Sequence, residues 1–442
     1  MSLKDKPINL AKNVSRREIW SWAMFDFANS GYTTVVITTI FNAYFVSIVA
    51  NNQDWGAFAW TATLAASYAL IIITAPIIGI YADIYAAKKR LLLFTVIGCI
   101  IFTSLLSFVG SGDLWLAIFL IIFANFFFGT GENLIAAFLP EIAKNNSLGK
   151  ISGWGWSLGY IGGLVSLGCS FIYILWAKSQ EHQPEQFVPV TLLITASLFA
   201  IASLPTFIYL KERAQPQKLL YCHNLIIEIF SRLIITIKQL RNFHDLTRFL
   251  ICLIFYQAGI QTIVVITAIY AQQVMNFTHN DTILLVVLVN ITAALGAFIF
   301  GTVQDTIGHI PTIAITLIGW IVMILLAWGA QDRTMFWIAA NIAGLSLGAS
   351  QSAGRALIGY LSPILQRAEF FGLWGLAVKL SSIIGPLTYG LVSWLSHGDH
   401  RLALLITSIY FIIGLLILMG VNAQRGRQIA LNNNQTCNTP SY

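Results

Sequence analysis

The sequence predicts an all-α integral membrane protein whose twelve transmembrane helices form two pseudo-symmetric bundles of six. Of its 442 residues, 57% are hydrophobic and only 10% are charged, whereas soluble chains carry roughly 25% charged residues. The apolar residues gather in runs of about 20 or more, which is long enough to cross the hydrocarbon core of a bilayer. Similar segments recur in the first and second halves of the chain, as internal repeats of six spans would produce.

The apolar runs divide the chain into spans and connecting segments, with boundaries good to a few residues. The predicted spans are 20–48, 57–82, 91–110, 114–139, 153–176, 190–210, 247–273, 282–303, 310–329, 334–360, 370–396 and 401–422. The resulting units are an N-terminal segment 1–18, a first bundle 19–210, a linker 211–246, a second bundle 247–423 and a tail 424–442. Apolar residues recur at helical period in the linker, which predicts an amphipathic helix on the cytoplasmic membrane surface. The tail is rich in Asn and is expected to be disordered.

The distribution of basic residues orients the spans. With the amino terminus in the cytoplasm, the inside segments hold 20 Lys and Arg residues and the outside loops hold three. Cytoplasmic loops of membrane proteins carry such an excess, so both termini are expected in the cytoplasm. The net charge of +7 therefore reflects membrane topology, and no nucleic-acid partner is expected.

The sequence predicts neither an enzyme nor a metal site. The five cysteines are scattered and lack metal-ligand spacing. At membrane depth there is no Ser/His/Asp set, thiol pair or Walker loop that would indicate catalysis or nucleotide hydrolysis. His397, Asp399 and His400 lie in a predicted outer loop, where solvated side chains are a better explanation than a metal site. No cofactor is expected.

Two pairs of segments show the repeat. The stretch 33–45 reads TTVVITTIFNAYF and the stretch 262–274 reads TIVVITAIYAQQV, each near the start of its half. A Gly-x-x-x-Asp motif ends span two and recurs at the end of span eight. Six-span repeats are typical of transporters, in which substrate is held between the halves.

Twelve spans with Gly-x-x-x-Asp after spans two and eight resemble the major facilitator superfamily. The residues of the two motif copies are Gly79, Asp83, Lys88, Lys89, Arg90, Gly301, Asp305 and Gly308. The first copy has Ala86 where the superfamily usually has Gly, and the second copy lacks the basic pair. The motif is expected to tie helix ends together and to tune the inward/outward equilibrium without touching substrate.

Within the superfamily, the chain resembles the vacuole-effluxer group, which contains fungal vacuolar amino-acid exporters and many bacterial members. The similar stretches are WAMFDFANS at 22–30, GYIGG at 159–163, EFFG at 369–372, and Lys379 followed by Gly385-Pro386. The resemblance implies a protein of the bacterial inner membrane that moves amino acids or similar small metabolites.

The chain departs from this group at three places. Span seven has Gln257-Ala258 where the group has Asn-Asp, span ten has Ala356 after its Arg where the group has Ser, and Ala136 replaces an Asn in span four. The substrate or its coupling is therefore expected to differ from those of the relatives.

Four charged residues lie within the predicted spans, namely Asp26, Glu132, Arg355 and Lys379. At about 1.5 Å per residue, each lies roughly 8–14 Å from the cytoplasmic edge, which puts two acids and two bases at one level. Unpaired charges are costly at that depth, so pairing is expected. The cluster is interpreted as an inner gate or as a site for a charged group, with Asp26 or Glu132 as the candidate carrier of a coupled proton. Two alternatives stay open: the basic side chains extend to the membrane interface, or Asp26 is only a structural partner.

Uncharged polar residues are the candidates for contacts with substrate near the midplane. They are Thr33, Asn125, Gln257, Gln261, Asn290, Asn341 and Gln351. Hydrogen bonding between helices is the alternative role for each amide. An amide-rich midplane suits a neutral or zwitterionic solute.

The sequence thus favours a secondary transporter that moves an amino acid or similar zwitterion by alternating access, with protons as the candidate coupling ion. One alternative is transport of anions such as siderophores or organic acids. An alternative of another class is a non-transporting receptor or scaffold, which the short linker disfavours. The expected partners are a small-molecule substrate and membrane lipid, and the expected state is monomeric.

Overall fold

The computed structural model describes residues 14–53, 55–144, 146–217 and 225–436, and this part of the chain is helical without β-strands. The helices of the first half are α1 (Arg16–Tyr32), η1 (Thr33–Thr39), α2 (Ile40–Tyr44), η2 (Phe45–Val49), α3 (Gly56–Tyr85), α4 (Lys88–Leu105), η3 (Leu106–Phe108), α5 (Leu114–Ala136), α6 (Leu139–Ile142), α7 (Leu148–Ser179) and α8 (Pro184–Tyr209). The remaining helices are α9 (Leu225–Gln239), α10 (His244–Gln273), α11 (His279–Ile307), α12 (His309–Gly329), α13 (Arg333–Leu361), η4 (Ile364–Gln366), α14 (Arg367–Leu395), α15 (His400–Met419) and α16 (Ala423–Thr436).

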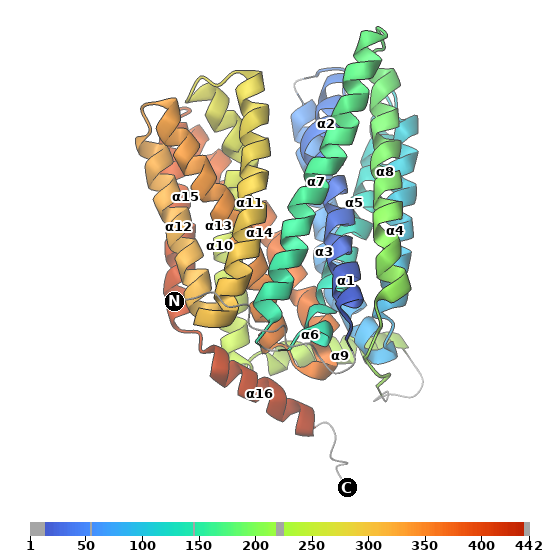
Figure 1. The fold of residues 1–442 in the computed structure, drawn as a ribbon, viewed down its shortest axis with the longest axis vertical. Helices are drawn as coiled ribbons and strands as arrows, with labels where there is room; N and C mark the ends of the chain where they lie inside the picture. Colours follow the sequence, from blue (N-terminus) through green and yellow to red (C-terminus); the bar gives the residue numbers. More distant parts are fainter. Residues whose placement is uncertain (1–13, 54, 145, 218–224, 437–442) are drawn as a thin grey trace.

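The long helices form two bundles, one from α1 to α8 and one from α10 to α15 (Figure 1). The bundles converge at the end of the molecule that carries α6, α9 and α16, which we call the linker end, and lie farther apart at the opposite end, the far end (Figure 1). Between the bundles, α7 packs against α11 and α13, and α14 packs against α3 and α5.

Eleven helical segments in the described part of the chain are long and apolar enough to cross a membrane, against twelve predicted spans. The predicted tenth span is α13, which is 29 residues long but is not among the eleven. Its second half is a run of small and polar residues that neighbouring helices bury. Because other helices rather than lipid surround it, α13 can be long without being strongly apolar.

The first span is a continuous helical segment from Arg16 to Val49, but it is not the regular α-helix that the sequence predicts. It turns π-helical at η1 and again at η2. The similar stretch 262–274 in the second half lies in the regular helix α10. Helix η1 also contains a cluster of threonines whose hydroxyls bond to carbonyls four or five residues earlier. Such π-helical turns recur at functional sites of proteins.

The linker contacts both halves at the linker end. Ile229 of α9 packs against Ile80 and Ile84 of α3. The Gln217 backbone N–H donates to the Ile84 carbonyl at 2.8 Å, and its side-chain amide donates to the Leu365 carbonyl of the second half at 2.6 Å. The predicted amphipathic helix is thus present as α9, and part of its apolar face is covered by α3. Residues 218–224 of the predicted linker lie outside the described residues.

The tail differs from the expected disorder, because α16 continues to Thr436. Its first turn is held by Asp245, which accepts hydrogen bonds from the Arg425 guanidinium at 2.7 Å and from the Asn422 backbone N–H at 2.8 Å. The amino-acid composition of the tail gives no sign of this contact with Asp245, which belongs to α10. Residues 437–442 of the tail and 1–13 of the N-terminal segment lie outside the described residues.

The end of α3 offers a test of backbone strain. Ala86 has a φ of +48° and ψ of +50°, a left-handed conformation that is costly for any residue with a Cβ. We expect Ala86→Gly to raise the free energy of unfolding by about 0.5–1 kcal/mol. Ala87→Gly, at a φ of −113°, is the matched control and should slightly destabilise the protein. Thermal unfolding in detergent measures both, and equal shifts would contradict the strain argument.

Candidate functional site

The two halves approach each other through glycines at the linker end. A Cβ on Gly79 of α3 would overlap the Ala368 carbonyl at the start of α14. A Cβ on Gly153 of α7 would overlap the Ala297 carbonyl and the Cα of Gly301, both on α11. Helices can approach each other this closely only where a residue lacks a side chain, so both of these interfaces between the halves depend on glycine.

Asp83 and Asp305 make matching contacts beside these glycines. Asp83 of α3 accepts a hydrogen bond from the Glu369 backbone N–H in the first turn of α14, at 2.9 Å. Asp305 of α11 accepts from the backbone N–H groups of Gly149 and Lys150 in the first turn of α7, at 2.9 and 2.8 Å. A carboxylate is favourable at a helix N-terminus, where N–H groups lack partners within the helix. Each half therefore holds the other by the same contact.

The basic run after the first motif makes different contacts. Lys88 is buried and forms an ion pair with Glu141, while the Lys89 ammonium donates to the Leu210 carbonyl at 2.6 Å. The Glu212 carboxylate accepts from the backbone N–H groups of Lys88 and Lys89 at 2.8 and 3.0 Å. Burial raises the pKa of Glu212, although these two N–H groups act against the shift. Arg90 is exposed. The two lysines, Lys88 buried and Lys89 half-buried, thus connect parts of the first half and the start of the linker.

Arg355 of α13 crosses from the second half into a site built by the first half. Its guanidinium donates to the Asp26 carboxylate at 2.7 Å, to the Ser152 hydroxyl at 3.1 Å and to the Ser152 carbonyl at 2.8 Å. Its Cζ also lies 4.8 Å from the ring centroid of Trp22 and 5.4 Å from that of Trp156, positions suited to cation–π attraction. Arg355 is only 3% exposed. This set of five residues, which we call the arginine clamp, joins α13 to α1 and α7.

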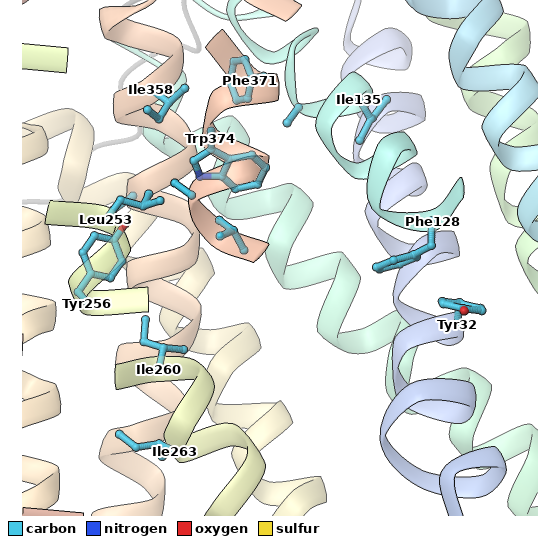
Figure 2. Close-up of a cluster of buried hydrophobic side chains, with 14 of the residues drawn as sticks. Tyr32, Phe128, Ile135, Leu253, Tyr256, Ile260, Ile263, Ile358, Phe371 and Trp374 are labelled. Atoms are coloured by element: carbon cyan, nitrogen blue, oxygen red, sulfur yellow. The ribbon is translucent and has the colours of Figure 1, made fainter. Parts of the chain in front are cut away.

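Glu132 of α5 and Lys379 of α14 form a second ion pair between the halves. Their single contact is 3.3 Å long, and 24% of the Glu132 side chain and 10% of the Lys379 side chain are exposed. The ammonium lies 5.5 Å from the ring centroid of Tyr68 and 5.8 Å from that of Phe128. Phe128 packs in turn on Tyr32 with ring centroids 5.0 Å apart, and the two rings lie together in Figure 2. We call Glu132, Lys379, Tyr68 and Phe128 the lysine site.

The two pairs differ in how completely their charges are satisfied. The Arg355 side chain donates three hydrogen bonds, whereas Lys379 has one long contact with an acid; each cation also lies over two aromatic rings. The basic side chains are buried between the halves, so the alternative in which they extend to the membrane interface is wrong.

The predicted amides bond mainly within their own half. Gln257 and Gln351 bond to each other at 2.8 Å, joining α10 to α13, and Asn125 donates to Ser67 of α3 at 2.6 Å. The other two asparagines donate to carbonyls of their own helices, Asn290 to Val286 and Asn341 to Trp337. Thr33 and Gln261 are half-buried. A role in substrate contact stays a prediction for all seven.

Several residues around the charges are absent from the sequence-based site. They are Trp22, Ser152, Trp156, Tyr68 and Phe128. A usable signal exists for two pairs, since Trp22 precedes Asp26 by four residues and Phe128 precedes Glu132 by four, and residues at that spacing share a helix face. Ser152 and Trp156 come from α7, which only tertiary packing places beside α13.

The described residues show no group of three or more His, Cys, Asp or Glu side chains placed to hold a metal ion. The contacts between the two helical halves are ionic and hydrogen-bonded.

Comparisons with known proteins agree with this architecture. A family model described as "Vacuole effluxer Atg22 like" matches residues 146–431, and a "Major Facilitator Superfamily" model matches residues 4–167. The chain is 26% identical to the uncharacterized MFS-type transporter YxiO of Bacillus subtilis, over 94% of this chain and 97% of that one. It is 23% identical to autophagy-related protein 22 of Vanderwaltozyma polyspora, over 87% of this chain and 81% of that one.

Among solved structures, the proton:xylose symporter XylE superposes with a TM-score of 0.72 at 12% sequence identity, covering 95% of this chain and 98% of that one. At this identity the likeness shows the fold alone, which is that of the major facilitator superfamily. Members of this superfamily are transporters and not enzymes. Because the first family model covers more than half of the chain, the protein belongs to the vacuole effluxer Atg22-like family of major facilitator superfamily transporters.

Proposed function

We propose that this protein moves a small zwitterion, with an amino acid as the first candidate, by alternating access between its two halves. The single observation that carries the proposal is the lysine site, where an acid and a base from opposite halves meet through one long, partly exposed contact. A zwitterion carries the complementary pair of charges, so its carboxylate would replace Glu132 on Lys379 and its ammonium would replace Lys379 on Glu132.

The arrangement of the halves supports the alternating-access part of the proposal. The Gly79 and Gly153 approaches, the Asp83 and Asp305 contacts and the arginine clamp all join the halves on the side of the linker end. The bundles diverge toward the far end (Figure 1). We therefore assign the structure to a state closed at the linker end, and transport requires these contacts to break together.

The long contact between Glu132 and Lys379 suits a site in which each residue exchanges its ionic partner for a charge of the substrate. A buried charge pair is costly to break, because each partner is left without its counter-ion in a medium of low dielectric constant. A zwitterionic substrate removes that cost, since each charge keeps an opposite charge nearby when the substrate enters. The proposed cytoplasmic orientation of the linker end would make this state open to the outside of the cell.

Glu132 is also the better of the two acids for carrying a coupled proton. Its side chain is twice as exposed as that of Asp26, 24% against 12%, and its contact with a cation is longer. A proton can reach such an acid more readily, and losing the weaker ion pair on protonation costs less.

The test is transport by purified protein in vesicles, using a broad amino-acid panel with and without a pH gradient. Glu132→Gln and Lys379→Gln should each reduce uptake or efflux at least about tenfold, because each removes one charge–charge contact with the substrate. Failure of every amino acid to move would reject the proposed substrate class. Loss of the gradient dependence in Glu132→Gln would support proton coupling through that residue.

The double variant Glu132→Gln/Lys379→Gln separates recognition from structure. If the pair only stabilises the fold, two neutral amides should restore transport to near the wild-type rate, because no buried charge is left unpaired. If the pair binds substrate, the double variant stays inactive while its thermal unfolding temperature returns toward that of the wild type. Matched analogues that lack the ammonium or the carboxylate then show which charge each residue recognises.

A further inference from the structure

A pocket separate from the arginine clamp and the lysine site lies at the linker end of the first half. It has a volume of about 530 Å³ and lies between the start of α1 and the end of α8. The lining residues are Ser15, Arg16, Arg17, Glu18, Ile208, Tyr209 and Lys211. None of these residues belongs to the arginine clamp or the lysine site, so the transport proposal leaves this pocket unexplained.

The charges that line this pocket favour an anion. Arg16, Arg17 and Lys211 are exposed, and neither arginine has an ion-pair partner among the residues described. The acid in the lining is already neutralised, because both oxygens of Glu18 accept hydrogen bonds from the Arg213 guanidinium, at 2.6 and 2.9 Å. Glu18 also accepts from the Lys211 backbone N–H at 3.1 Å and is buried. Three cations therefore face the pocket without a competing carboxylate.

The wall of the pocket on the side of α8 is apolar and continues along that helix. Ile208 is 67% exposed and Tyr209 is 47% exposed, and Leu204 and Ile201 continue the exposed strip one and two turns away. Trp20, one helical turn after Arg16 on α1, is half-exposed and stacks on Trp154 with ring centroids 5.9 Å apart. Tryptophan and tyrosine are enriched at the level of lipid headgroups in membrane proteins. The pocket therefore combines cations at headgroup level with an apolar strip where acyl chains would lie.

We propose that this pocket binds the phosphate headgroup of an anionic phospholipid, with its acyl chains along the exposed strip of α8. A freely dissolved phosphate would use the same three cations, but it would gain nothing from the apolar strip. Basic pockets beside transmembrane helices are suited to anionic headgroups because each cation adds attraction to the lipid. The position of Lys211 directly after α8, where the linker to the second half begins, connects an occupied pocket to the segment that bridges the halves.

The test compares lipids and variants on the full-length protein in detergent. Phosphatidylglycerol should raise the unfolding temperature and should appear as bound lipid in native mass spectra. Phosphatidylcholine or inorganic phosphate at the same concentration should do neither. The variant Arg16→Gln/Arg17→Gln/Lys211→Gln should bind phosphatidylglycerol roughly 100-fold more weakly, at about fivefold for each cation removed.

A matched variant removes three exposed cations elsewhere at the linker end, namely Lys144→Gln/Lys238→Gln/Arg241→Gln. It loses the same net charge and should bind phosphatidylglycerol like the wild type. Equal weakening in both triple variants would show general attraction to basic charge and would overturn the proposal. Protection by inorganic phosphate alone, or equal binding of phosphatidylcholine, would overturn it as well. If the pocket variant unfolds without lipid, Lys211→Gln alone carries the test, with an expected loss of about fivefold.

This inference does not depend on the transport proposal, because lipid binding is measured without any substrate. A protein that moves no amino acid can still bind phosphatidylglycerol in this pocket, so the transport proposal and the lipid proposal can each be rejected without the other.

Discussion

Arg355→Gln is expected to open the linker end and to reduce transport by about two orders of magnitude. The substitution leaves Asp26 largely buried without its cation, and breaking a buried pair from one side costs about 3–5 kcal/mol. The arginine clamp joins α13 to α1 and α7, so this cost falls on the state in which the linker end is closed. At 1.4 kcal/mol for each factor of ten, a loss of about 3 kcal/mol shifts the ratio of the two states by roughly 100-fold.

The shift can be measured as a distance between spin labels at the far end. Lys178 of the first half and Gln331 of the second half are exposed there, and replacing the native cysteines provides the background for labelling. Arg355→Gln should increase the population of molecules with the shorter distance between labels, because the far end closes when the linker end opens. The double variant Asp26→Asn/Arg355→Gln removes both charges and should restore part of the population with the longer distance between labels. A distribution identical to wild type in Arg355→Gln would falsify the role of the clamp in holding the closed state.

Gly153→Val is expected to act on the same equilibrium by sterics alone. Its side chain would overlap the Ala297 carbonyl and the Cα of Gly301 on α11. Backbone atoms of a packed helix cannot move aside as a flexible side chain can, so α7 and α11 must separate. Overpacking of this kind costs about 1–3 kcal/mol, and here the cost applies only while the halves touch. Transport should fall because the closed state of the linker end becomes rare.

Gly168→Val on the same helix is the matched control. A Cβ at Gly168 meets nothing within 4 Å. This variant therefore changes helix propensity and side-chain volume as much as Gly153→Val does, but it does not touch the second half. The distance between the spin labels should change in Gly153→Val and should equal that of the wild type in Gly168→Val. The same shift in both variants would mean that valine acts through the helix itself and not through the contact with α11.

Much of the fold follows from local patterns along the chain. Apolar runs of membrane-spanning length and the repeated Gly-x-x-x-Asp motif predict the two bundles, because lipid forces every span to satisfy its backbone hydrogen bonds within a helix. Two elements escape this logic for physical reasons. Helix α13 is shielded by protein and so lacks the apolar composition of a lipid-facing span, and α16 is held by the contact of Arg425 with Asp245.

The candidate site was only partly accessible from the sequence. Charges inside apolar spans are rare and costly, so Asp26, Glu132, Arg355 and Lys379 stand out by depth alone, and the cost of isolation predicts that they pair. The amides are harder to interpret, since Gln257 can bond equally well to a substrate or to a neighbouring helix. Their role depends on a geometry that composition and spacing do not contain.

Residue type and spacing alone predict a membrane transporter of two six-helix halves with four charges at one level on the cytoplasmic side of its spans. Which acid meets which base depends on how α1, α5, α13 and α14 pack, and this separates a tight pair, Asp26 with Arg355, from a loose one, Glu132 with Lys379. The physical reason is that Coulomb attraction favours any of the four acid–base combinations, whereas distance and burial choose among them. Ser152 and the two tryptophans of the clamp come from α1 and α7, so only the packed structure places all of them around one guanidinium.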